Sequence, residues 1–221
     1  MFSSFRLWSD GIYRCDALQE FVWQQHGFGT RAAQPRVDIT LRQVHSNRIV
    51  NATGLADRTE EGDALITNEI AKSIGVRTAD CVPILLVDSR RRAVAAVHAG
   101  WRGTAAEVVK HTVGRMASDF GSESRNLYAA LGPCIRHCCY EVGPEVLEHF
   151  SRWATGRPSC PPKRKLSLPE VNIQQLIEIG VSEDLIFDCG LCTTCQSGQF
   201  FSFRRERENP GRMVASVARL D

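Results

Sequence analysis

The sequence is divided into short apolar runs of four to eight residues, bounded by turn-forming or charged residues. Runs of this length that are rich in aliphatic side chains are typical of β-strands. Two of the runs, residues 82–88 and 93–98, are separated only by a short polar segment, which indicates a hairpin or a pair of neighbouring strands. We predict strands over residues 38–43, 64–67, 74–77, 84–88, 92–98, 127–131 and 212–219.

Helical patterns are fewer than strand patterns. Residues 104–117 carry apolar side chains at the three- and four-residue spacing of a helix, and Gly103-Thr104 is expected to cap its N-terminal end. Shorter helices are predicted over residues 144–150 and 171–179, and Gly180 is expected to end the second of these.

The order of these elements favours one fold class. Helices do not alternate regularly with strands, which argues against a doubly wound sheet. The length of 221 residues fits one domain with a full hydrophobic core. We therefore predict an α+β fold, with a mixed β-sheet core flanked by helices, as a single domain over residues 1–221.

Composition excludes several classes of partner. A net charge of +2 gives no overall attraction to nucleic acid or to anionic membranes, and no apolar run approaches the about 20 residues that span a bilayer. The N-terminus lacks the features of a secretory signal peptide, so we expect a cytoplasmic protein. Residues 157–169 are basic and proline-bearing and are expected to form an exposed loop.

The nine cysteines are an odd number in a chain expected to stay in a reducing compartment. Reduced thiols that act as ligands, as nucleophiles or as core residues are therefore expected, rather than a disulfide framework. Cys15 and Cys160 are predicted to fill the core.

Three residues form a candidate metal centre. His45, Cys81 and His98 each lie at the end of a probable strand, and two imidazoles with one thiolate suit zinc while leaving one coordination position open. The gaps between them match no compact zinc-finger spacing, so the fold would have to assemble the site. The alternative is that each histidine is a hydrogen-bonded polar residue near a sheet edge.

Residues beside these three indicate an anion site. Asp80 precedes the cysteine and could orient a ligand from behind. Arg102 follows a strand end, a glycine turn and a helix start, a geometry that suits phosphate. Arg48 and Arg77 lie near the other two ligand segments. We predict Asp80 and the three arginines as substrate-binding residues.

The sequence resembles the YfiH, or DUF152, family of laccase-domain proteins, also called multicopper polyphenol oxidases. The resemblance runs nearly end to end and is carried by HGFGTR, QVHS, EGDALIT, TADCVPILL, HAGWRG, LGPCIRHCCYEVG, CTTC, FFSFRRE and GRM. It implies a fold similar to that of toxin deamidases, and a metal centre of His45, Cys81 and His98 that generally holds zinc. Two positions differ from the family pattern: Phe203 stands where a tyrosine is usual, and the glycine-rich continuation after Arg31 is missing.

The resemblance also implies a reaction. Family members are described as purine nucleoside phosphorylases that act on adenosine, inosine, guanosine and 5′-methylthioadenosine, with an accompanying adenosine deaminase activity. The expected ligands are a purine nucleoside and inorganic phosphate, and the expected oligomeric state is a monomer or a small homo-oligomer. Weaker candidates for ligand contact are Phe28, Trp101, Tyr140 and Glu141.

Three other functions are alternatives to a zinc-dependent phosphorylase. A hydrolase or deamidase could use Cys81 as nucleophile with His98 or His45 as base, and sequence alone does not separate it from a zinc enzyme. A copper-dependent polyphenol oxidase needs a histidine-rich cluster, and the chain has six histidines with two well placed. A non-catalytic binding module is the remaining alternative.

Two further groups of cysteines have no assigned role. Cys189, Cys192 and Cys195 have a spacing that resembles a metal or iron–sulfur site, but the sequence names no fourth ligand. The other group is Cys134, Cys138 and Cys139, in which adjacent residues of an extended segment would face opposite ways. Both groups are predicted to be structural or to line the pocket without a second metal, and His137 is predicted to lie at the surface.

Overall fold

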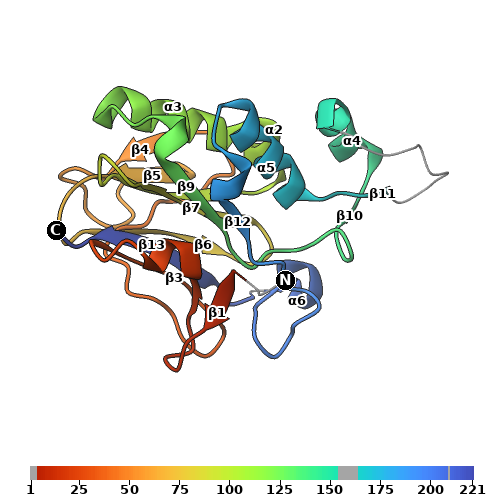
Figure 1. The fold of residues 1–221 in the computed structure, drawn as a ribbon. Coiled ribbons are helices and arrows are strands. Elements are labelled where there is room, and N and C mark those ends of the chain that lie inside the picture. Colours follow the sequence, from red (N-terminus) through yellow and green to blue (C-terminus); the bar gives the residue numbers. More distant parts are fainter. Residues whose placement is uncertain (1–3, 154–163, 209) are drawn as a thin grey trace.

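A computed structural model describes residues 4–153, 164–208 and 210–221. Two β-sheets pack face to face, and helices cover the outer face of one of them (Figure 1). This arrangement confirms the predicted fold class, with the difference that the core holds two sheets. The first sheet has five antiparallel strands in the order β1 (Phe5–Leu7), β2 (Tyr13–Cys15), β3 (Gln24–Phe28), β13 (Met213–Arg219) and β6 (Ser73–Thr78).

The second sheet is mixed and lies between the first sheet and the helices. Its two edge strands are parallel to their neighbours, and the inner pairings are antiparallel. The order is β12 (Ile186–Asp188), β9 (Leu127–Leu131), β7 (Val82–Asp88), β8 (Val94–Ala99), β5 (Ala64–Thr67) and β4 (Ile49–Asn51). A separate two-stranded ribbon joins β10 (Glu141–Val142) to β11 (Arg164–Lys165).

Three helices cover the second sheet: α2 (Trp101–Ala105), α3 (Val108–Phe120) and α5 (Leu168–Glu178) (Figure 1). The remaining helical elements are short. They are α1 (Asp16–Gln19), α4 (Pro144–Leu147), α6 (Phe203–Glu206) and the 3₁₀ turns Ser124–Asn126, Glu148–Trp153 and Glu183–Leu185.

Strand β7 explains why the layers stack in this order. All seven of its residues are buried, so the strand is apolar on both faces. Ile84 and Leu86 pack toward the helices, whereas Leu85 and Val87 pack toward the five-stranded sheet. Successive side chains of a strand point to opposite faces, and a continuous apolar run therefore requires a packed layer on each side. A hydrophobic core thus lies on both faces of the central sheet.

Most strand predictions are confirmed. The predicted 64–67 and 127–131 coincide with β5 and β9, and the predicted neighbours β7 and β8 pair in antiparallel register. The prediction for 38–43 is wrong, because this segment makes only isolated bridges at Ile39 and Arg42. Its backbone makes scattered hydrogen bonds to two different segments, near residue 73 and near residue 60, and the amide and hydroxyl of Thr40 both donate to Asp57.

The predicted single helix over 104–117 is also wrong. The chain forms α2 and α3, separated by Glu107 in the left-handed region at a φ of 55°. At the break the Thr104 carbonyl accepts two hydrogen bonds, one from the Glu107 amide and one from the side-chain amide of Gln175 in α5. Gly100, not Gly103-Thr104, caps the start. By contrast, Gly180 does follow the end of α5, at a φ of 92°.

The short strands β1, β2, β3, β4, β10, β11 and β12 were not predicted. The expected loop over 157–169 lies partly outside the described residues, as does Cys160. Its described part contains β11 and the start of α5. Cys15 is fully buried, as predicted.

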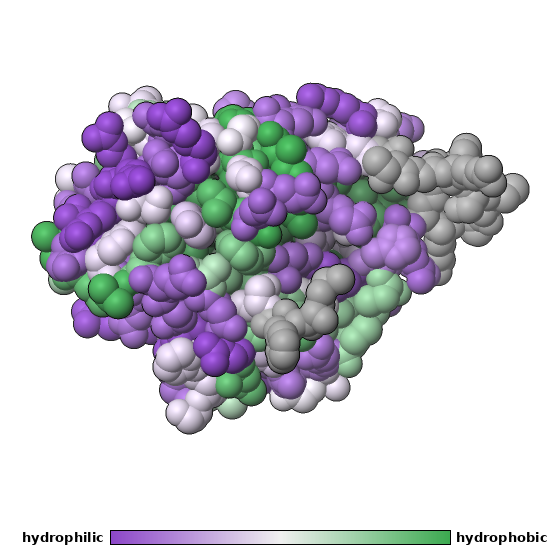
Figure 2. Space-filling model, in the orientation of Figure 1, coloured by the Kyte–Doolittle hydropathy of each residue, from purple (hydrophilic) through white to green (hydrophobic). Residues whose placement is uncertain are grey.

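On the face shown in Figure 2, hydrophobic residues form small groups among hydrophilic ones. Within the described ranges, no helix has the length and apolar character needed to cross a membrane.

Candidate metal centre and arginine-lined cavity

A cavity of about 590 Å³ contains all three predicted metal ligands in its lining. His45 comes from the loop before β4, Cys81 directly precedes β7, and His98 lies in β8. Because β7 and β8 are paired, with Pro83 opposite His98, the cysteine and this histidine reach the same end of the sheet. The fold thus assembles residues that are far apart in the sequence.

The three side chains are close enough to share one ion. Their ligand atoms all lie within 4.8 Å of one another, and the two imidazole centroids are 4.9 Å apart. Gly100 leaves the room for this approach, since a Cβ there would lie 3.0 Å from the Cys81 Sγ and 3.0 Å from a ring carbon of His45. Two nitrogens and one sulfur fit zinc with one position left for another ligand.

Asp63 organises the centre from behind. Its fully buried carboxylate accepts a hydrogen bond from Nδ1 of His98 at 2.8 Å and from the backbone amides of His45 and Ser46. These bonds hold His45 in a left-handed conformation, with a φ of 59°. With Nδ1 engaged by Asp63, Nε2 of His98 remains for a metal, which is the usual arrangement for ligating histidines.

Asp63 was not predicted as a site residue. The motif EGDALIT carries it directly before a buried strand. A carboxylate at that position has to find hydrogen-bond donors, and this was the available signal.

The electrostatics of the centre favour an ionised thiolate beside a charged imidazole. Burial opposes ionisation of Cys81, but the charge of His98 and hydrogen bonds with both histidines outweigh it and lower the pKa of Cys81 to about 6. Burial likewise disfavours a charged His98, but Cys81 and Asp63 raise its pKa to about 9. A thiolate is the form of cysteine that binds a metal or attacks as a nucleophile.

Asp80 lines the cavity, but its carboxylate is directed to a different segment. It accepts hydrogen bonds from the hydroxyl of Thr193 at 2.6 Å, the hydroxyl of Ser202 at 3.1 Å and the backbone amide of Arg204 at 2.7 Å. Its φ of 87° is left-handed. Asp80 therefore anchors the segment 193–204 to the wall of the cavity, and Asp63 is the carboxylate that contacts a candidate ligand.

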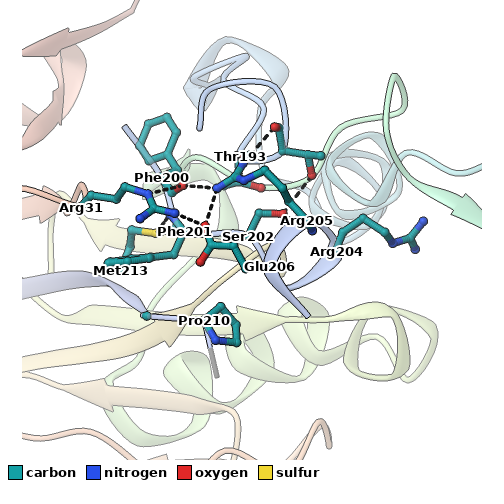
Figure 3. Close-up of polar contacts among 12 residues, drawn as sticks. Arg31, Thr193, Phe200, Phe201, Ser202, Arg204, Arg205, Glu206, Pro210 and Met213 are labelled. Atoms are coloured by element: carbon teal, nitrogen blue, oxygen red, sulfur yellow. Dashed lines mark hydrogen bonds and ion pairs between the residues drawn. The ribbon is translucent and has the colours of Figure 1, made fainter. Parts of the chain in front are cut away.

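The segment anchored by Asp80 is clamped further by Arg205 (Figure 3). The guanidinium of Arg205 donates to the carbonyl oxygens of Thr193, Thr194 and Phe200. Glu206 pairs with both Arg205 and Arg31, so the N-terminal part of the chain is tied to the same segment. These contacts fix the wall from which Phe203 and Arg204 reach the cavity.

Of the three arginines predicted from the sequence, two line the cavity and one does not. Arg77 and Arg102 are part of the lining, and Arg77 has a buried Nε without a hydrogen-bond partner. Arg48 is paired with Glu60 at 2.8 Å, and its side chain is 56% exposed. The lining also contains three arginines that were not predicted: Arg58, Arg204 and Arg212.

Aromatic side chains complete the cavity. Trp101 and Tyr140 line it, together with Phe203, and the guanidinium groups of Arg102 and Arg204 lie over the rings of Trp101 and Tyr140. The other two candidates for ligand contact lie elsewhere. Phe28 is buried between the sheets, and Glu141 is exposed on β10.

Comparison with known proteins identifies the family. The family model described as multi-copper polyphenol oxidoreductase laccase matches residues 22–220. The chain belongs to this laccase-like family. A member of known structure, YlmD from Geobacillus stearothermophilus, has the same fold, with a TM-score of 0.88, 26% sequence identity and coverage of 99% of this chain and 100% of that chain.

Relatives with assigned names are more similar in sequence. A purine nucleoside phosphorylase from Clostridium acetobutylicum is 37% identical over 179 residues, which cover 80% of this chain and 75% of the relative. An adenosine deaminase from an unknown prokaryotic organism is 39% identical over 209 residues, or 86% of this chain and 79% of the relative. A purine nucleoside phosphorylase from Bacteroides thetaiotaomicron is 36% identical, and the chain spans only 60% of its length.

Proposed function

We propose that the protein is a zinc-dependent purine nucleoside phosphorylase. One observation carries the proposal: a candidate zinc centre and a set of arginines line the same cavity. A phosphorolytic enzyme has to hold a phosphate and a nucleoside together, and this cavity offers cationic and aromatic groups side by side. The names of the relatives in Clostridium acetobutylicum and Bacteroides thetaiotaomicron support the same reaction.

The arginines supply the phosphate site. Arg77 and Arg102 bind the anion by charge-assisted hydrogen bonds, since both residues line the cavity. The acidic residue of the lining, Asp80, has both carboxylate oxygens engaged by the segment 193–204, so it adds little repulsion. Arg58, Arg204 and Arg212 add positive potential at the same cavity.

The aromatic residues supply the nucleoside site. Trp101 and Tyr140 present apolar faces in the cavity, and a purine is planar and stacks on such faces. Phe203 has no hydroxyl to donate to the ligand, so this wall binds by packing. The cavity would accept adenosine, inosine, guanosine or 5′-methylthioadenosine.

His45, Cys81 and His98 would hold the zinc, and Asp63 would keep His98 in the tautomer that binds it. Zinc bound there supplies a Lewis acid and lowers the pKa of a bound water toward about 7. That chemistry also suits removal of the 6-amino group of adenosine, the activity named for the relative from the unknown prokaryotic organism. We propose adenosine deamination as a side activity.

A metal-free hydrolase or deamidase is the second candidate, and a specific arrangement favours it. Cys81 lies against His98, whose other ring nitrogen contacts Asp63, in the order of a nucleophile, a base and an orienting carboxylate. Copper oxidation has less support. All six histidines are among the described residues, and only His45 and His98 belong to a potential metal group there.

The deciding experiment combines metal analysis with a product assay on one preparation of protein. Phosphorolysis predicts one zinc at this centre, and adenine plus ribose 1-phosphate formed from adenosine only when phosphate is present. A protein that lacks metal at this centre and forms neither product would refute the proposal. Alkylation of Cys81 in that protein, with loss of an amide hydrolysis, would establish the hydrolase. Stoichiometric copper would establish the oxidase.

We further propose that the protein acts in the cytoplasm, as a monomer or small homo-oligomer, with small-molecule substrates rather than nucleic acid or membranes as ligands.

A further inference from the structure

A second group of potential metal ligands lies outside the zinc centre just described. Cys138, Cys139, Cys192 and Cys195 place their sulfur atoms within 4.8 Å of one another. The Sγ of Cys195 is 3.6 Å from that of Cys138 and 3.3 Å from that of Cys139. Cys192 is buried, whereas Cys138 and Cys195 are exposed, so the group lies at the surface and is accessible to a metal ion. We call it the four-cysteine cluster.

Tertiary structure supplies the ligands that the sequence alone did not. Adjacent cysteines would face opposite ways on a strand, but Cys138 and Cys139 lie in a turn, in which the Cys139 and Tyr140 amides both donate to the Arg136 carbonyl. Cys192 and Cys195 belong to a second turn, since residue 196 donates its amide to the Cys192 carbonyl at 3.1 Å. Each turn contributes two thiols.

Backbone and ion-pair contacts hold the two turns together. Cys134 pairs with Cys192 as an isolated parallel bridge, through bonds from the Cys134 amide to Leu191 and from the Thr193 amide back to Cys134. Next to this bridge, Arg136 forms a bidentate ion pair with Asp188, with both distances at 2.6 Å. The turns are thus positioned by contacts that do not involve the four thiols.

The second turn also has the ligand spacing of a metal-binding knuckle. Cys192 and Cys195 are separated by two residues, the spacing common in structural zinc sites. The hydrogen bond that closes this turn brings both thiols to the same side as the pair from the first turn.

We propose that the four-cysteine cluster binds a second zinc ion as a closed, structural tetrathiolate site. With zinc–sulfur bonds of about 2.3 Å, the sulfur atoms of a tetrahedral site lie about 3.8 Å apart. The observed separations of Cys195 from two different cysteines are near this value. Cys195 is close to both of them at once, an arrangement that suits a shared ion better than one disulfide. The proposal does not depend on the phosphorylase reaction.

The four-cysteine cluster lies directly beside two segments of the cavity wall, so this second zinc would have a structural role there. Cys139 directly precedes Tyr140, which lines the cavity, and Cys192 directly precedes Thr193, whose hydroxyl donates to Asp80. A zinc ion that joins the two turns would therefore fix two parts of the cavity wall relative to each other. Cys138, Cys139, Cys192 and Cys195 are positioning residues in this proposal, because none of them lies in the cavity lining.

The test counts zinc ions in the full chain, purified with a reductant, and compares two variants. Wild type is expected to hold two zinc ions, and both Cys81→Ala and Cys138→Ser/Cys195→Ser are expected to hold one. X-ray absorption then distinguishes the ions that remain. Cys81→Ala should show a sulfur-only shell at about 2.3 Å, and the double variant should show nitrogen together with sulfur.

Cys189→Ala is the matched control, because Cys189 lies in the same segment as the second turn but outside the cluster. It should keep both ions, and circular dichroism of each variant should establish that it is folded. A wild type with one zinc that Cys138→Ser/Cys195→Ser retains would overturn the proposal. Mass spectrometry that finds a disulfide within the cluster, or iron in place of zinc, would also overturn it.

Discussion

The candidate metal centre in the cavity and the four-cysteine cluster offer metals two different kinds of coordination. In the cavity, one thiol and two imidazoles leave a position open, and Asp63 supports them from behind. In the cluster, four thiols from two surface turns would close the coordination sphere. Open coordination is typical of catalytic zinc, and closed thiolate coordination is typical of structural zinc.

The difference follows from what surrounds each group. Two of the cavity ligands, Cys81 and His98, lie at the ends of the buried strands β7 and β8, and His45 reaches them from an exposed loop. Arginines and aromatic rings that can hold a substrate line the same cavity. The cluster ligands lie in turns fixed by an isolated bridge and by the Arg136–Asp188 ion pair. Rigid strands suit a site that has to keep reacting groups in place, and turns benefit most from a crosslink.

The largest expected effect comes from Cys81→Ala. Removing the only thiol of the open centre should abolish zinc binding there and lower phosphorolysis by at least about 10³-fold, because several kcal/mol of metal-derived stabilisation are lost. Phosphorolysis of adenosine and inosine measures the effect. The four-cysteine cluster should keep its own zinc.

The reciprocal variant sharpens this result. Cys138→Ser/Cys195→Ser should retain the zinc of the cavity and lower the midpoint of thermal unfolding, while its activity falls far less than that of Cys81→Ala. If both variants lost activity equally while folded, the assignment of one centre to catalysis and the other to structure would be wrong.

A smaller effect is expected from Asp63→Asn. The substitution keeps the shape of the side chain but removes the charge that orients His98, and loss of such a partner lowers metal affinity or activity by about 10–100-fold. Zinc affinity, measured by competition with a chelator, and kcat should fall together. If the protein is a metal-free hydrolase, Asp63→Asn should lower kcat, and neither wild type nor variant should contain zinc at this centre.

Asp88→Asn is the matched control for this change. Asp88 is also a fully buried aspartate, but it lies at the end of β7 that is away from Cys81. There it accepts hydrogen bonds from the backbone amides of Arg90 and Arg91. Its replacement should leave zinc affinity unchanged. Equal losses in the two variants would mean that Asp63 acts only through stability.

Residues of the site could be predicted from the sequence where their type and motif are distinctive, and were missed where only the fold brings them to the cavity. His45, Cys81 and His98 were found because their residue types are characteristic of zinc ligands and because the surrounding motifs resemble a family. Asp63 was missed because the sequence indicates only that a carboxylate before a buried strand needs donors, and it is the pairing of β5 with β8 that makes His98 one of them. Arg58, Arg204 and Arg212 were missed because their segments meet only in three dimensions.

For the fold as well, elements with a distinctive local pattern were predicted, and features without one were not. Strands buried on both faces, such as β7, are evident from continuous apolar sequence. The break at Glu107 was not evident, because the helical apolar spacing continues on both sides of it and no glycine or proline marks it. The short strand β1 is exposed at two of its three residues, so its position is determined by pairing rather than by its own hydrophobic pattern.

A further distinction concerns the arginines of the cavity. Arg102→Gln should raise the KM for phosphate by about tenfold. Hydrogen bonds with charged groups contribute about 1.5–3 kcal/mol, and the lower end of this range corresponds to about tenfold in affinity. Arg48→Gln is the control, because Arg48 is paired with Glu60 and lies outside the cavity lining. Its KM for phosphate should stay within twofold of wild type. A larger effect at Arg48 than at Arg102 would place the phosphate site elsewhere.

The smallest effect concerns His26, a buried imidazole that belongs to neither metal group. Burial, assisted by the charge of Arg14, lowers the pKa of His26 to about 3, whereas buried His98 is held charged by Cys81 and Asp63. In the folded state His26 accepts the Cys15 amide as a neutral ring. The unfolded chain binds a proton near pH 6.5, so the stability from neutral His26 is complete above that pH and falls as the pH decreases toward 3.

Between pH 7.5 and 5.5 this linkage should remove about 1.4 kcal/mol from the free energy of unfolding. His26→Gln keeps an acceptor for the Cys15 amide but does not titrate, so it should lack this part of the pH dependence. Urea unfolding of both proteins at the two pH values measures the difference, and the contribution of the metal centres cancels because both proteins retain them. If wild type and His26→Gln show the same pH dependence of the free energy of unfolding, His26 is protonated in the folded protein at pH 5.5. Burial would then not keep His26 neutral, and the proposed difference in charge between His26 and His98 would be wrong.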